Sequence, residues 1–133
     1  MSQENVEIVT GFMQAWSDHD RAEIARYLHP NAVFHSPTTN VVGETFYGRE
    51  QILGALDQWA EEWAAIRWEV EEYIDVAEHR VVTLHKAIAT GRASGVEVVR
   101  ELAGVIDIRE GHVVRHWIYL DRNEALEAAG LRE

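Results

Sequence analysis

The chain of 133 residues carries 23 acidic and 12 basic side chains, which gives a formal net charge of −11. A surface this negative repels phosphate groups and anionic lipids, so we expect neither nucleic acid nor a membrane as a partner. Hydrophobic residues make up 47% of the chain, more than a disordered protein would have. Cysteine is absent, which excludes disulfides and thiolate metal sites.

Nothing along the sequence divides it into separate parts. There is no internal repeat, low-complexity tract or linker rich in proline and glycine, so a single domain over residues 1–133 is predicted. The first nine residues carry acids and no apolar run, unlike a secretory signal peptide. No apolar stretch approaches the length that spans a bilayer. We therefore expect a cytoplasmic protein.

The first part of the chain has apolar residues at the three- and four-residue spacing of helices. The first stripe consists of Val6, Val9, Phe12, Met13 and Trp16. Asp20 is expected to cap a second helix, which has to end before Pro30. A third helix is expected after Gly48, with Trp59 and Trp63 on its apolar stripe.

Alternation of apolar and polar residues, typical of strands, dominates the second part. A short strand is predicted over 32–36 and a loop over 37–47, and after Ala65 the alternation continues almost to the end. The later strands are predicted at 66–76, 80–90, 96–109 and 112–120, with a final helix at 122–129. Glu110–Gly111 is expected to form a hairpin turn, and Asp121 to cap the final helix. This order predicts an α+β architecture with a space between the sheet and the helices.

Three stretches carry a resemblance to a known family. They read ENVEIVTGFMQAWSDHDRAEIARYLHPNAVFHSP, YGREQILGAL and REGHVVRHWIYLDRNEALEAAGL. With the strand-like middle, they make the chain resemble the SnoaL-like proteins of the nuclear transport factor 2-like, or ketosteroid isomerase-like, superfamily. The resemblance implies a cone-shaped α+β fold: a curved, mostly antiparallel sheet wrapped around three N-terminal helices, with a short C-terminal helix. Proteins of this fold include polyketide cyclases, isomerases and non-catalytic binders, so fold alone does not give the function.

The best-understood enzymes of this superfamily use acidic side chains that this chain lacks. Where ketosteroid isomerases have a tyrosine and two aspartates, the resemblance places Phe12, Ser36 and Gly104. Where limonene-type epoxide hydrolases have two aspartates, it places Val82 and Ile118, and Ile118 also matches the neighbourhood of the cyclase acid. The resemblance therefore does not transfer any of these three mechanisms.

Two histidines are candidates for proton transfer. His35 lies at the end of the first strand, and histidine titrates near neutral pH, so it could act as a general acid or base. The alternative is a histidine hydrogen-bonded to the neighbouring loop. His116 is either a second pocket residue or a core histidine. It lies about 13 Å from His112 on one strand, too far for one metal ion to bridge, and no metal site or cofactor is predicted.

Two basic residues on the long strands have two interpretations. If Lys86 and Arg100 point inward, they could hold an anionic group such as a carboxylate. If a bulge reverses the strand faces, they lie outside and pair with acids such as Glu72 or Glu101.

The opposite face of the sheet is expected to be apolar and to bind another protein surface. It carries Val99, Val105, Trp117 and Tyr119, a surface too apolar to stay in water. The resembling families use this face for a homodimer, and the same is predicted here.

The predicted pocket combines apolar residues with the two basic ones. It is lined by Phe12, Trp16, Trp59, Trp63, Val82, Lys86, Arg100, Leu102 and Ile118. Aromatic walls suit flat apolar ligands, although the same residues are ordinary core fillers. Three functions stay open at this point: a binder of a small apolar or aromatic molecule, a cyclase, isomerase or lyase that uses His35 on a polyketide- or steroid-like substrate, and a non-catalytic dimeric accessory module.

Overall fold

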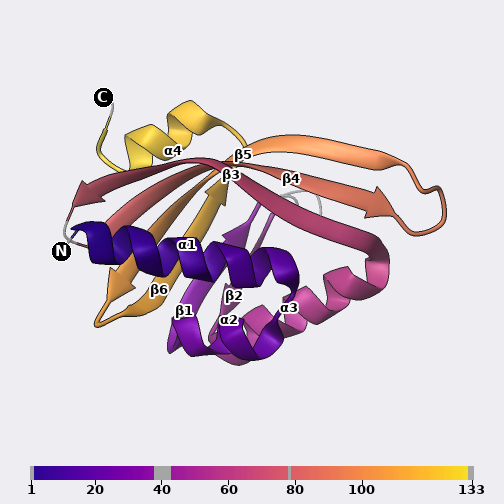
Figure 1. The fold of residues 1–133 in the computed structure, drawn as a ribbon, viewed down its shortest axis with the longest axis horizontal. Coiled ribbons are helices and arrows are strands. Elements are labelled where there is room, and N and C mark those ends of the chain that lie inside the picture. Colours follow the sequence, from indigo (N-terminus) through magenta and orange to yellow (C-terminus); the bar gives the residue numbers. More distant parts are fainter. Residues whose placement is uncertain (1, 38–42, 78, 132–133) are drawn as a thin grey trace.

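A computed structural model describes residues 2–37, 43–77 and 79–131. These residues form four helices and six strands, joined mostly by short turns (Figure 1). In chain order they are α1 (Ser2–Asp18), α2 (Arg21–Tyr27), β1 (Leu28–Ser36), β2 (Glu44–Tyr47), α3 (Arg49–Glu62), β3 (Trp63–Ala77), β4 (Arg80–Gly91), β5 (Glu97–Arg109), β6 (His112–Tyr119) and α4 (Arg122–Ala128). The predicted α+β fold is confirmed.

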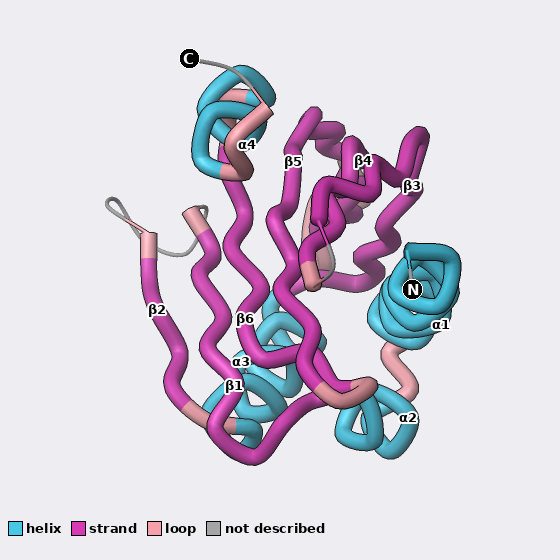
Figure 2. The backbone as a smooth tube through the Cα atoms, turned by 90° about the vertical axis from the view of Figure 1, so that its left-hand side faces the viewer, coloured by secondary structure: helices cyan, strands magenta, loops and turns pink. Residues whose placement is uncertain are grey.

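The strands make one open, mixed sheet. Its order is β2-β1-β6-β5-β4-β3, with β1 parallel to β6 and the other neighbours antiparallel. α4 is set apart from the other three helices in both backbone views (Figures 1 and 2). None of the helices in the described ranges combines the length and hydrophobicity needed to cross a bilayer.

The sheet buries apolar side chains on both of its faces. The larger cluster joins α1, α2 and α3 to the inner face, where Val81 and Ile106 are fully buried. The smaller cluster lies on the outer face, where Val82 and Val105 pack with Ala125 of α4. Neighbouring residues of β4 are therefore buried on opposite faces, because side chains alternate along a strand.

The predicted helix caps and hairpin turn are confirmed. The Asp20 carboxylate accepts a hydrogen bond from the Glu23 backbone N–H at 3.2 Å, and Asp121 accepts one from Asn123 at 2.7 Å. These bonds satisfy N–H groups that have no partner within their own helix. Glu110 and Gly111 both have positive φ angles, 50° and 81°, as a two-residue turn of type I′ requires.

Three predicted boundaries are wrong, the first because β1 begins at Leu28 and not at residue 32. The loop predicted over 37–47 contains β2, which pairs with β1 through Val33 and Tyr47; part of that loop, 38–42, lies outside the described residues. Trp63, placed on the third helix, has extended backbone angles and begins β3. Arg92, from the turn after β4, donates hydrogen bonds to the Trp63 carbonyl and to two carbonyls at the end of α3, which ends the helix there.

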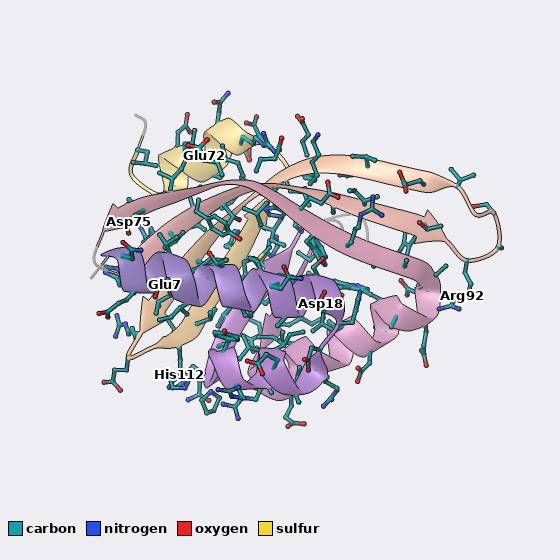
Figure 3. All side chains as sticks on the ribbon, viewed as in Figure 1. Glu7, Asp18, Glu72, Asp75, Arg92 and His112 are labelled. Atoms are coloured by element: carbon teal, nitrogen blue, oxygen red, sulfur yellow. The ribbon has the colours of Figure 1, made fainter. Side chains whose placement is uncertain are left out.

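Acidic side chains cover the outside of this fold. Glu7 and Asp18 on α1 and Glu72 and Asp75 on β3 are all exposed (Figure 3). Much of the negative charge is therefore carried where water solvates it.

Candidate functional site: an aromatic cleft and a buried histidine pair

A cleft of about 520 Å³ opens between α3 and the inner face of β3, β4 and β5. Its aromatic wall consists of Trp59 at the end of α3 and of Trp63 and Trp68 on β3. Ala87 and Ala89 on β4, which pair with Trp68 and Ile66 of β3, contribute only methyl groups to the sheet side of the cleft.

The opening of the cleft is polar. Glu44, Glu62 and Arg100 line it, and all three side chains are exposed. Arg100 extends from β5 two residues before Leu102, which lines the cleft from the same face and is buried. The cleft thus runs from charged groups at the surface to an apolar interior.

A cluster of polar side chains lies buried behind the apolar wall. Thr83 and His85 on β4 are 0% exposed, and His116 on β6 is 1% exposed. The Thr83 hydroxyl and the Nδ1 atom of His85 share a hydrogen bond of 3.1 Å. Gly104 on β5 lies between the two strands: a Cβ atom there would be 2.9 Å from Thr83 Oγ1 and 3.3 Å from His116 Nε2. The missing side chain of Gly104 is therefore what lets these polar groups approach one another.

Several nitrogen atoms of this region have no hydrogen-bond partner. In the described part of the chain they are Nε2 of His85, both ring nitrogens of His116, and Nε1 of Trp16 and of Trp68. Buried polar atoms are nearly always paired, and an unpaired one costs about 1–3 kcal/mol. Buried polar atoms of this kind are ordinarily paired by ordered water or by a bound molecule.

Both buried histidines are neutral at neutral pH. Burial lowers the pKa of His116 to about 3, and the neighbouring His85 lowers it further by repulsion between the two charged forms. Burial lowers the pKa of His85 to about 4. Each neutral imidazole offers one N–H donor and one acceptor nitrogen.

The aromatic rings connect this cluster to the cleft. The Trp68 ring, part of the cleft wall, lies 6.0 Å from the His85 ring, and Trp16 lies 6.3 Å from Trp68 and 5.4 Å from His116. Leu102, which also lines the cleft, is paired with His85 in the sheet. No group of three or more His, Asp or Glu side chains within the described ranges could hold a metal ion.

Comparison with known proteins agrees with the fold. The model of the SnoaL-like domain matches residues 9–116. The chain belongs to the SnoaL-like family. A comparison with the curated proteins finds no match.

Solved structures similar to this SnoaL-like chain have the same fold at low identity. One is an NTF2-like protein of unknown function from Burkholderia pseudomallei, with a TM-score of 0.78, 19% identity, and coverage of 93% of this chain and 95% of that one. Another is TerC co-crystallised with polyporic acid, with a TM-score of 0.77, 19% identity, and coverage of 96% and 98%. A third, from Catenulispora acidiphila in complex with trimethylamine, has a TM-score of 0.75, 18% identity, and coverage of 94% and 93%.

Seven of the nine residues predicted to line the pocket lie on the inner side of the sheet, and four of them line the cleft. Trp59, Trp63, Arg100 and Leu102 line the cleft itself. The other three, Phe12, Trp16 and Ile118, are buried in the adjoining core, where the Phe12 ring lies 5.5 Å from the His116 ring.

The two predicted pocket residues on β4 are on the wrong face. Val82 packs beneath α4, and Lys86 lies on the outer face, with its Nζ 3.9 Å from a carboxylate oxygen of Glu71. The inner face of β4 carries the odd-numbered residues instead. Of the two interpretations of the basic residues, the outer one holds for Lys86 and the inner one for Arg100.

His35 also lies on the outer face, because Phe34 beside it points into the inner core. Its ring stacks on Trp117 with centroids 4.3 Å apart, and its Nδ1 pairs with the Thr45 hydroxyl at 2.9 Å. Burial and the nearby Arg115 lower its pKa. The structure therefore agrees with the alternative interpretation, in which the His35 ring is hydrogen-bonded to the neighbouring segment. A catalytic role for His35 stays a prediction that has no contact with the cleft to support it.

The Thr83–His85 pair was not predicted from the sequence. The even-numbered residues Val82, Leu84 and Ile88 form the more apolar set of β4, which favours the inner face for them on hydrophobicity alone. One signal was available in the sequence. Once β4, β5 and β6 are aligned, four residues share one face of the sheet: Thr83, His85, Gly104 and His116.

Proposed function

We propose that this SnoaL-like protein binds a small aromatic or otherwise apolar molecule in the cleft between α3 and the sheet. The observation that carries the proposal is the wall formed by Trp59, Trp63 and Trp68 around about 520 Å³ of space. That volume lies within the range of about 300–1,000 Å³ that is usual for ligand pockets. Flat aromatic ligands stack favourably on such rings.

Two neighbours of the same fold support a role in binding small molecules. TerC was crystallised with polyporic acid, and the Catenulispora acidiphila protein with trimethylamine. Identities of 19% and 18% show the fold alone, so the proposal rests on the residues of this cleft.

Removing one wall of the cleft is expected to weaken binding. In a titration of ¹⁵N-labelled protein with naphthalene, the indole signals of Trp59, Trp63 and Trp68 should shift and that of Trp117 should not. Trp59→Ala should raise the Kd about tenfold or more, because a large aromatic contact is lost. Trp117→Ala is the matched control, since Trp117 stacks on His35 at the outer face. Equal Kd values for both variants would place the probe outside the cleft.

An enzymatic role is the second candidate. The observation that favours it is the buried pair of neutral histidines, because a neutral imidazole beside a bound carbonyl compound can accept or release a proton. A cyclase or isomerase on a polyketide- or steroid-like substrate would then use His85 and His116 in place of His35. The enzymatic role predicts that the wild-type protein converts a bound ketone and that His116→Phe does not.

A homodimer through the outer sheet face stays part of the proposal, over a smaller surface than the sequence predicts. α4 covers Val105, which is 2% exposed, whereas Val99 on β5 remains 52% exposed. We expect a dimer in sedimentation velocity at micromolar concentration, weakened by Val99→Glu. A monomer at that concentration would remove the dimer from the proposal and leave the cleft unaffected.

A further inference from the structure

We infer that the cleft selects apolar ligands that carry a positively charged amino group, held at the opening of the cleft chiefly by Glu62. This inference rests on the proposed function and specifies the ligand class of the same site. The starting observation is that carboxylates and aromatic rings share one lining. At the end of α3, Glu62 lies between Trp59 and Trp63 in sequence, and Glu44 contributes a second carboxylate from β2. Carboxylates and aromatic faces are the two kinds of group that attract an ammonium ion most strongly.

The position of Glu62 follows from the geometry of the helix. Glu62 comes three residues after Trp59, so the two side chains lie on the same face of α3, and both line the cleft. The Gln58 side chain, one turn earlier, donates a hydrogen bond of 3.2 Å to Oε1 of Glu62. This bond orients the carboxylate beside the rings. A carboxylate has about four acceptor sites, so it can also accept a hydrogen bond from an ammonium group of the ligand.

The tryptophan rings add an attraction that an uncharged ligand group does not feel. The face of an indole ring is electron-rich and attracts a cation that lies within about 6 Å of its centre. The outer face of the sheet contains one such contact, in which Cζ of Arg115 lies 4.4 Å from the centre of the Trp117 ring. In the described part of the chain, no basic side chain makes this contact with Trp59 or Trp63. A ligand cation would therefore have no competitor at these two rings.

The balance of charge at the opening favours a cation over an anion. Two carboxylates, Glu44 and Glu62, outnumber the guanidinium of Arg100, and none of the three forms an ion pair within the described ranges. The net charge of −11 attracts cations to the whole molecule and repels anions. Arg92, close to the same end of α3, binds backbone carbonyls there and is not part of the lining.

Exposure of the three charged side chains keeps the cost of binding a cation low. Because they lie at the surface, the ammonium group can keep part of its hydration while the apolar part of the ligand enters the cleft. The same exposure weakens each ion pair, so the selectivity should be moderate and should decrease at high salt.

The test compares two probes of similar size that differ in charge, 1-naphthylmethylamine and 1-naphthylmethanol, by titration at pH 7.5, where the amine is protonated. The wild type should bind the amine about tenfold more tightly, the combined effect of an exposed ion pair and a cation–π contact. Glu62→Gln keeps the size of the side chain and removes its charge, so this preference should fall about threefold. Glu61→Gln is the matched control, because Glu61 is an exposed neighbour outside the lining, and it should keep the preference.

A third variant changes the local charge in the opposite direction. Arg100→Gln removes the positive charge of the lining, so it should increase the preference for the amine. Because Glu62 and Arg100 are both exposed, neither substitution is expected to prevent folding.

The inference and the proposed function fail in different ways. Equal affinity for amine and alcohol, or the same preference in Glu62→Gln as in the wild type, would overturn the inference. Tighter binding of 1-naphthylacetate than of the amine would also overturn it and would indicate that Arg100 holds an anionic group. If none of these naphthalene compounds binds, the proposed function itself is wrong.

Discussion

In the His116→Phe variant, the free energy of unfolding is expected to depend less steeply on pH between pH 5 and 6.5 than in the wild-type protein. Burial lowers the pKa of His116 to about 3 and that of His85 to about 4, from an ordinary value of 6.5. As the pH falls below about 6.5, the unfolded chain binds protons on these two histidines and the native protein does not. The free energy of unfolding therefore falls with pH across this window, and stability is fully present above it.

The size of this effect is measurable. Between pH 6.5 and 5 each buried histidine should reduce the free energy of unfolding by about 1.5 kcal/mol, and the pair by about 3 kcal/mol. Most carboxylates titrate below this window, so they contribute little to the slope. Urea unfolding at pH 5, 6, 7 and 8 measures it, with His112→Phe as the exposed control. An unchanged slope in His116→Phe would show that His116 gains a proton as readily in the native protein as in the unfolded chain.

Replacing Trp16 by alanine should cause the largest loss of stability. Its side chain is fully buried, and its ring lies 5.4 Å from Phe12 and 5.0 Å from Phe34. Removing the indole leaves a cavity between α1 and the sheet, and such changes cost about 3–5 kcal/mol. Urea unfolding at pH 7.5 gives the value. Trp117→Ala on the outer face is the control and should cost clearly less, because Trp117 is only partly buried. Equal losses would mean that the inner core collapses around the missing ring.

Most of the fold could be predicted from local patterns because each pattern has a direct physical cause. The apolar stripe of α1 and the caps Asp20 and Asp121 depend only on residues a few positions apart, and the structure confirms them. The end of α3 could not be predicted, because Trp63 continues the helical spacing. The hydrogen bonds that favour its extended conformation come from Arg92, distant in sequence. β2 was not predicted because its four residues, between Gly43 and Gly48, are too few to show the alternation of apolar and polar residues that identifies a strand.

The candidate site was harder to predict than the fold. Alternation identifies the two faces of a strand, but it does not say which face is concave. His35, a candidate for proton transfer, and Lys86, included among the predicted pocket residues, both lie on the outer face. On β4 the hydrophobicity of the side chains does not identify the inner face. The apolar Val82 is buried on the outer face by α4, whereas the polar His85 lies on the inner face. The packing of α4 depends on the whole sheet and leaves no local signal.

A crystal structure of the protein with 2-naphthol tests the central claim most directly. We predict that the rings lie against Trp59, Trp63 and Trp68 in the cleft. A probe bound outside the cleft would contradict the proposed function.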